Sequence, residues 1–309
     1  MNTFGPVMTA MVTPFDAQGR VDLEKAAELA TRLLSEGTDT IVVAGTTGES
    51  PTLTHDEKLA LFRTVKAAVR TAPVVAGTGS NDTQASVALT REAEACGVDG
   101  ILAVNPYYNK PPQEGLYRHF RAMAEATRLP VIVYNIPGRT GVNLDVSTLA
   151  RLAELPNIAA VKEASGNLDQ VSETARVVGA AYGAAKGAGA RALRPHDFAI
   201  YSGDDSLTLP MLSVGGYGVV SVVAHVAGRE IREMIEAFHA GDVNRAASLH
   251  ARLLPLFKGL FMTTNPIPVK AALKLKGFDA GGLRLPMIEA TPAQVDAIRA
   301  LMLEAGVLS

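Results

Sequence analysis

The chain has 309 residues, of which 48% are hydrophobic, and its 29 lysines and arginines nearly balance its 31 aspartates and glutamates. No run of five like charges occurs, so the sequence offers no electrostatic basis for binding nucleic acid or an anionic membrane surface. Its single cysteine, Cys96, cannot form an intrachain disulfide, and no CxxC pair or Cys/His cluster predicts a metal site. The start of the chain lacks the features of a signal peptide. These properties predict a cytoplasmic protein that acts on a small ligand.

Short apolar runs recur along the chain, and stretches with helical spacing separate them. The eight runs cover residues 7–12, 40–44, 73–77, 100–104, 131–135, 158–162, 198–201 and 218–222. Each run is apolar almost without a break, as parallel strands that are covered on both faces require. The sequence therefore predicts a parallel sheet with helices between its strands.

The helical stretches carry their own start and stop signals. An apolar stripe from Leu23 to Leu34 ends before Gly37, which suits a left-handed helix cap. Thr54 and Glu57 form a capping box at the start of the next helix. Eight evenly spaced strand and helix repeats predict an α/β fold of the (β/α)8 TIM barrel type. An open doubly wound sheet is the alternative, although it seldom uses eight such units.

The remaining sequence divides the chain in two. Residues 1–239 are predicted to form the catalytic (β/α)8 barrel, and residues 240–309 a C-terminal extension of three helices. The Gly/Ala-rich segment 179–195 lengthens the connection between the sixth and seventh strands. Because it follows a helix and precedes a strand, we expect a surface extension at the end of the barrel away from the chemistry.

Catalytic groups of such barrels lie just past the carboxyl ends of the strands. Lys162 closes the sixth apolar run and would project into the mouth of the barrel. An ordinary lysine, with a pKa of about 10.4, is almost fully charged at pH 7 and is a poor nucleophile. Burial lowers this pKa, which is how lysines that form Schiff bases are activated. The structural alternative is a lysine that simply ends the strand and pairs with Glu163.

The segment 45–50, Gly-Thr-Thr-Gly-Glu-Ser, follows the second strand. Its two glycines permit a close backbone approach, and Thr46 and Thr47 supply hydroxyl groups, as in an anion-binding loop. It lacks the lysine of a phosphate loop, and an ordinary turn is the alternative.

Two residues mark the end of the fifth strand. The hydroxyl of Tyr134, in an otherwise apolar strand, needs a partner at the strand's end, which allows a proton relay or simply a satisfied core tyrosine. The planar guanidinium of Arg139 can bind a carboxylate through two parallel hydrogen bonds. The alternative is an ordinary solvated arginine.

Together these motifs resemble the dihydrodipicolinate synthase/N-acetylneuraminate lyase family of class I aldolases, which form a Schiff base with pyruvate. The resemblance covers nearly the whole chain. It is carried by GTTGES at 45–50, NPYYNKP at 105–111, YNIPGRTG at 134–141, VKEASGN at 161–167, SGDD at 202–205 and NPIPVK at 265–270.

The resemblance implies a role for each residue of a proton relay. Lys162 would form the Schiff base, Tyr134 would give and take protons near the imine, and Thr46 would link Tyr134 to Tyr108. Tyr108 would reach into the site of a neighbouring subunit, which implies a homotetramer built as a dimer of dimers. No metal and no cofactor other than the covalent Schiff base is expected.

The resemblance also implies the substrates, pyruvate and L-aspartate 4-semialdehyde. Thr47 and the loop amides around Gly48 would hold the pyruvate carboxylate, and Arg139 would hold the carboxylate of the semialdehyde. The backbone carbonyl near Val220 would orient Lys162.

Members of the family that lysine inhibits have an effector site at a subunit contact. Its residues match Ser50, His55, Asn81 and Tyr107. Two other positions depart from the pattern, because Lys58 stands where those members commonly have histidine and Ala85 where they have glutamate. A cationic lysine would meet like charge and lose an acidic partner, so weak or absent feedback inhibition is expected.

Three alternatives to this function stay open. The chain could be another pyruvate aldolase, acting on N-acetylneuraminate or 2-keto-3-deoxy sugar acids. It could be a catalytically silent small-molecule sensor on the same barrel, since a fold does not determine a function. A phosphate-using barrel would have only the glycines Gly215 and Gly216 in its favour.

Overall fold

The computed structural model describes residues 4–178 and 198–308. Eight parallel strands pair in chain order, and pairing of β8 with β1 closes the sheet into a barrel. The predicted (β/α)8 barrel is confirmed, with strand ends that differ from the prediction by at most two residues. The strands are β1 (Val7–Ala10), β2 (Thr40–Val43), β3 (Val74–Gly77), β4 (Gly100–Val104), β5 (Val131–Asn135), β6 (Ile158–Glu163), β7 (Ala199–Ser202) and β8 (Gly218–Ser221).

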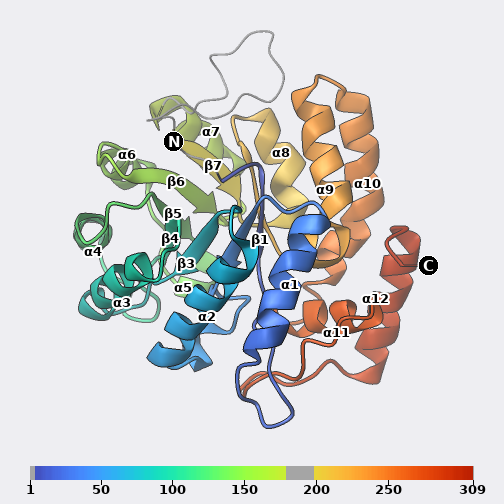
Figure 1. The fold of residues 1–309 in the computed structure, drawn as a ribbon. Helices are drawn as coiled ribbons and strands as arrows, with labels where there is room; N and C mark the ends of the chain where they lie inside the picture. Colours follow the sequence, from blue (N-terminus) through green and yellow to red (C-terminus); the bar gives the residue numbers. More distant parts are fainter. Residues whose placement is uncertain (1–3, 179–197, 309) are drawn as a thin grey trace.

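Helices surround the barrel, as Figure 1 shows. Those that follow successive strands are α1 (Leu23–Ser35), α2 (His55–Val69), α3 (Thr83–Ala95), α4 (Gln113–Glu125), α5 (Pro137–Thr140), α6 (Val146–Ala153), α7 (Leu168–Val178), α8 (Thr208–Ser213) and α9 (Ala224–His239). Two short 3-10 helices, η1 (Ser50–Thr52) and η2 (Asp205–Leu207), lie in the loops after β2 and β7. The Gly/Ala-rich segment 179–195 and the surface extension predicted for it lie outside the described residues.

Two buried apolar clusters explain why the strands read as unbroken apolar runs. Alternate strand residues such as Met8, Val42 and Ile132 fill the interior of the barrel. Their neighbours, such as Val7 and Ile41, face outward and pack beneath the helices. Because both faces of each strand are covered, neither face needs polar residues.

The predicted helix signals are present. The Thr54 hydroxyl accepts a hydrogen bond from the Glu57 amide at 3.2 Å, and the Glu57 carboxylate accepts one from the Thr54 amide at 2.8 Å. Gly37 has a φ of +108°, and a Cβ there would lie 2.7 Å from the Gly228 carbonyl carbon and oxygen. Only glycine combines that backbone angle with so close a contact.

Three helices follow α9: α10 (Val243–Gly259), α11 (Ile267–Leu275) and α12 (Pro292–Glu304). They lie on the side of the barrel that carries α1 and α9 (Figure 1). The boundary predicted near residue 240 falls in the turn between α9 and α10. α10 packs along α9, so the extension is in direct contact with the last helix of the barrel. The division into two domains stays a prediction.

Candidate active site

Lys162 and Tyr134 lie side by side near the carboxyl ends of their strands. They are register partners on β6 and β5, and the Lys162 amine lies 4.1 Å from the centre of the Tyr134 ring. Only 5% of Lys162 is exposed. Burial lowers the pKa of Lys162 to about 7; the negative charge of Asp205 opposes this shift, and the positive charge of Arg139 adds to it. Near neutral pH a large fraction of this amine is therefore uncharged.

Glu163, the alternative partner of Lys162, is engaged elsewhere. Its carboxylate accepts hydrogen bonds from the side chains of Asn135 and Gln170, both at 3.1 Å, and from the Ser165 amide at 2.7 Å. Successive side chains of a strand point to opposite faces, so Glu163 faces the outside of the barrel while Lys162 faces its interior. The ion pair between Lys162 and Glu163 is not formed.

Tyr134 keeps its proton over the physiological range. Burial raises its pKa to about 12, while the charge of Arg139 and a side-chain hydrogen bond with Thr46 act in the opposite direction. The structure therefore brings together three of the predicted residues: Lys162, Tyr134 and Thr46.

Tyr108 does not join this group within the single chain. Its side chain is 89% exposed, and its backbone has a φ of +73°. The backbone of Lys110, two residues later, is also in the left-handed region, with a φ of +43°. Non-glycine residues in this region are uncommon and cluster at functional loops. The predicted insertion of Tyr108 into a neighbouring subunit is compatible with this exposure, and it stays a prediction.

A cavity of about 210 Å³ opens beside Tyr134. Thr46, Arg139, Ser50 and Tyr107 line it together with small and apolar residues from the ends of β2 to β5. Polar groups thus lie on an otherwise apolar wall, which is the usual character of a small-molecule site.

The loop after β2 is a compact turn. The Gly48 amide donates to the Gly45 carbonyl at 3.1 Å, which closes the turn. A Cβ on Gly48 would lie 3.1 Å from the Met11 carbonyl oxygen, which accounts for the glycine. Thr47 is buried, and its hydroxyl accepts a hydrogen bond from the Asn265 side-chain amide at 2.8 Å. Because the Thr47 oxygen acts as an acceptor, its own hydrogen can be donated to an anion.

Two buried residues near the site were not singled out from the sequence. Asp205 accepts hydrogen bonds from the Ser221 hydroxyl and from the amides of Val222 and Val223, at 3.0 and 3.2 Å. Burial raises its pKa to about 6, and these hydrogen bonds oppose the shift. Asn265, from the segment before α11, fixes Thr47. Both residues belong to motifs that carried the family resemblance, which was the only signal that pointed to them.

Val220 and the proposed effector residues are only partly brought to the site. Val220 lies on β8 within the barrel interior, and no hydrogen bond of the described residues joins it to Lys162. Ser50 and Tyr107 line the cavity, whereas His55 and Asn81 are not among its lining residues. His55 and Asn81 interact with other residues. His55 pairs with Glu92 at 3.0 Å, and the Asn81 carbonyl accepts a hydrogen bond from the Asn109 side chain at 2.9 Å.

Other kinds of site find little support in the described part of the chain. Gly215 and Gly216 precede β8 and so lie at the end of the barrel opposite to Lys162, where they cannot line a phosphate site beside it. Residues 4–178 and 198–308 contain no group of three His, Cys, Asp or Glu residues that could hold a metal ion. Nor is any helix in those ranges long and apolar enough to cross a membrane.

A closed eight-stranded barrel whose mouth holds a buried lysine of low pKa beside a tyrosine is typical of enzymes that form a Schiff base with their substrate. Residues 3–305 match the Dihydrodipicolinate synthetase family, and the chain belongs to that family. The 4-hydroxy-tetrahydrodipicolinate synthase of Moorella thermoacetica is 57% identical over 306 residues, which cover 99% of each chain. The chain is thus a member of a lyase family.

Solved structures agree with this assignment. The dihydrodipicolinate synthase of Cyanidioschyzon merolae, crystallised with lysine bound, is 48% identical, with a TM-score of 0.92 over 100% of both chains. A dihydrodipicolinate synthase from Bacillus anthracis is 47% identical, with a TM-score of 0.90 over 98% of this chain and 99% of the other.

Proposed function

We propose that this chain condenses pyruvate with L-aspartate 4-semialdehyde to give 4-hydroxy-tetrahydrodipicolinate, in diaminopimelate and lysine biosynthesis. The observation that carries the proposal is the desolvated Lys162 amine beside Tyr134 at the mouth of the barrel. Relatives named for this activity match the chain over nearly its full length. Action in the cytoplasm is part of the same proposal.

The covalent steps use the Lys162 amine as the nucleophile. The neutral amine adds to the ketone carbon of pyruvate, and loss of water leaves an imine. The protonated imine acts as an electron sink, so a methyl proton can leave to give an enamine. The enamine carbon attacks the aldehyde carbon, and the aldehyde oxygen takes up a proton. The amine of the semialdehyde part then closes on the imine carbon and releases Lys162. No metal or further cofactor is needed for these steps.

Tyr134 carries the protons in this scheme. With a pKa of about 12 it is a donor at neutral pH, and its contact with Thr46 provides a route for a proton to leave or return. We assign the third position of the relay to Tyr108 of a neighbouring subunit, since the exposed Tyr108 of the same chain lines no part of the cavity. The relay then requires at least a dimer, within the proposed homotetramer.

The carboxylates of the substrates would bind on two sides of Lys162. Thr47, whose oxygen accepts from Asn265, would donate its hydroxyl hydrogen to the pyruvate carboxylate. For the amides around Gly48 to join it, they would have to share or exchange their hydrogen bonds within the turn. Arg139, which lines the cavity, would form a bidentate contact with the carboxylate of the semialdehyde. The carbonyl near Val220 would orient the lysine amine.

A comparison of aldehydes tests the substrate assignment. The purified protein is offered pyruvate with L-aspartate 4-semialdehyde, with N-acetylmannosamine or with a sugar-acid aldehyde, and pyruvate consumption is measured. We expect rapid consumption only with the semialdehyde, because Arg139 suits a short substrate with a carboxylate. Preference for a sugar would favour the related aldolases, and no reaction with any aldehyde would favour a silent sensor.

The pH dependence of kcat/KM for pyruvate should follow the protonation of Lys162. The ammonium form cannot attack a ketone, and the pKa of Lys162 is about 7. As the pH falls below 7, kcat/KM should therefore fall by about tenfold per unit, whereas above 7 it should level off. Initial rates between pH 5.5 and 8.5, with circular dichroism to show that the protein stays folded, provide the measurement. A flat profile below pH 7 would contradict the assignment.

Inhibition by L-lysine should be weak. Lys58 is half-buried on α2, and burial lowers its pKa, so its environment already disfavours positive charge before a second cation approaches. Ala85 supplies no carboxylate to offset that charge. We expect more than half of the activity to remain at 1 mM L-lysine at subsaturating pyruvate, whereas half-inhibition below that concentration would show that the site is functional. The double change Lys58→His with Ala85→Glu should increase the inhibition.

A further inference from the structure

Glu49 ends the loop after β2 in an unusual conformation. Its backbone is left-handed, with a φ of +57° and a ψ of +34°. A non-glycine residue adopts this conformation only where its surroundings hold it there. The Glu49 amide donates to the Thr46 carbonyl at 3.0 Å, so whatever holds Glu49 also holds the turn that presents Thr46 and Thr47.

The group that holds Glu49 is a buried lysine from the far end of the chain. The Lys270 amine on α11 lies 2.7 Å from Glu49 Oε1, and both side chains are 3% exposed. The same amine donates to the Gly282 carbonyl at 2.7 Å and lies 4.4 Å from the centre of the Phe15 ring. Two charges so fully removed from water are tolerated because each compensates the other.

Arg284 contacts the same loop through its backbone and its side chain. Its backbone amide donates to Glu49 Oε2 at 3.0 Å, and its guanidinium donates to the Thr52 carbonyl and to the Glu57 carboxylate, each at 2.8 Å. The second carboxylate oxygen of Glu49 is therefore satisfied independently of Lys270. Loss of the lysine would leave a buried carboxylate with one partner and weaken the hold on the turn that contains Thr46 and Thr47.

We infer that Lys270 and Glu49 form a positioning pair that sets Thr47, and with it the pyruvate carboxylate, against Lys162. This inference rests on the proposed function. The pair touches neither substrate in the proposed scheme, and it acts through the backbone of the loop. Its loss should therefore weaken pyruvate binding more than it slows the chemistry, and it should leave the affinity for the semialdehyde nearly unchanged.

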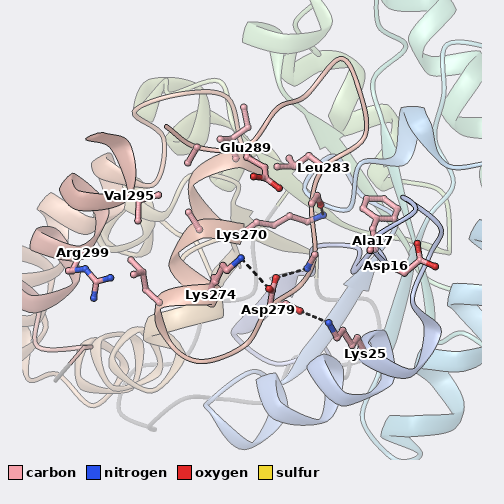
Figure 2. Close-up of a pocket in the computed structure, with 17 residues that line it drawn as sticks. Asp16, Ala17, Lys25, Lys270, Lys274, Asp279, Leu283, Glu289, Val295 and Arg299 are labelled. Atoms are coloured by element: carbon pink, nitrogen blue, oxygen red, sulfur yellow. Dashed lines mark hydrogen bonds and ion pairs between the residues drawn. The ribbon is translucent and has the colours of Figure 1, made fainter. Parts of the chain in front are cut away.

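The chain supplies a matched control one turn further along the same helix. Lys274 is 70% exposed and pairs with Asp279 at 3.2 Å, and it lines a cavity of about 780 Å³ between α11, α12 and the loop after β1. Figure 2 shows the Lys274 side chain reaching Asp279 in this cavity. The Lys270 side chain points in a different direction, towards Leu283. Exchange of Lys274 for methionine removes an equivalent charge from α11 without touching the loop.

The experiment compares the wild type with Glu49→Gln, with the double variant Glu49→Gln and Lys270→Met, and with Lys274→Met. For each protein, the steady-state constants for both substrates and the thermal unfolding midpoint are measured. The double variant removes both buried charges together, so no unpaired charge is left to unfold the protein. We expect its pyruvate KM to rise about tenfold or more, with kcat within about threefold of the wild type. Glu49→Gln should raise this KM by about threefold, and Lys274→Met should leave it unchanged.

A purely structural role predicts a different result. The double variant would then recover the pyruvate KM of the wild type together with its stability, and this outcome would overturn the inference. If the double variant does not fold, an unchanged pyruvate KM in Glu49→Gln would overturn it equally. The pyruvate concentration that gives half-maximal borohydride trapping on Lys162 is measured in parallel. Because this readout needs no aldehyde, failure of condensation with the semialdehyde would refute only the proposed substrate pair.

Discussion

Exchange of Lys162 for methionine is expected to abolish condensation, with kcat falling by about 10⁴-fold or more, as happens when a covalent nucleophile is removed. Methionine is unbranched and close to lysine in length, so it can fill the buried space on β6 without leaving a cavity. The exchange removes the amine that we propose captures pyruvate. Rates of pyruvate and semialdehyde consumption, measured for the variant and the wild type at the same enzyme concentration, provide the test.

The same variant should be more stable than the wild type at neutral pH. The pKa of Lys162 falls from 10.5 in the unfolded chain to about 7 in the fold. Between pH 7 and pH 10.5 the unfolded state therefore binds more protons than the folded state. Stability is therefore gained as the pH rises from 7 to 10.5, and the cost of the lysine is fully present below pH 7. That cost is on the order of 5 kcal/mol at most. The stability advantage of Lys162→Met should thus be largest at or below pH 7 and shrink towards pH 10.5.

Lys258→Met serves as the control, since Lys258 is an exposed lysine on α10. It should retain wild-type activity and show no such pH-dependent gain in stability. An inactive Lys162→Met with a lower unfolding midpoint at pH 7 would mean that the lysine supports the fold, which contradicts a buried amine kept at a cost to stability.

Exchange of Tyr134 for phenylalanine should lower kcat by about 10² to 10⁴-fold, the usual contribution of a positioned proton donor. The aromatic ring that packs beside the Lys162 amine stays in place, so the imine should still form. Only the hydroxyl that contacts Thr46 is lost. Turnover by the variant, together with trapping of pyruvate by borohydride, separates the proton-transfer step from the capture of pyruvate.

Tyr201→Phe is the matched control for this exchange. Tyr201 is the register partner of Lys162 on β7 and is fully buried, but its hydroxyl donates to the Gly5 carbonyl at 3.0 Å, away from the reacting groups. Its loss should cost about 1 kcal/mol of stability and leave kcat nearly unchanged. Equal losses of kcat in the two variants would show that Tyr134 acts through packing and not through its proton.

The parts of the molecule that follow from local pattern were predictable. The unbroken apolar runs indicated strands covered on both faces, and alternate residues do face the interior and the helices. The capping box at Thr54 marked the start of α2 to the residue. Lys162 could be placed at the mouth of the barrel because the carboxyl ends of all parallel strands meet there.

Features that depend on contacts between distant parts of the chain could not be predicted from local pattern. No spacing rule brings Lys270 or Asn265 to the loop after β2, because the packing of the C-terminal helices against the barrel decides these contacts. Asp205 has the sequence context of an ordinary acidic loop residue, and only the fold encloses it with the backbone amides after β8. Tyr108 is exposed in the single chain, and its place in the site of a neighbouring subunit stays a prediction.

Borohydride reduction in the presence of pyruvate, followed by peptide mass spectrometry, tests most directly that a buried neutral amine captures the substrate. We expect a single reduced pyruvate adduct on the peptide that contains Lys162, formed without any aldehyde and lost as the pH falls well below 7. An unmodified Lys162 under conditions in which the protein condenses its substrates, or an adduct on another lysine alone, would contradict capture by this amine.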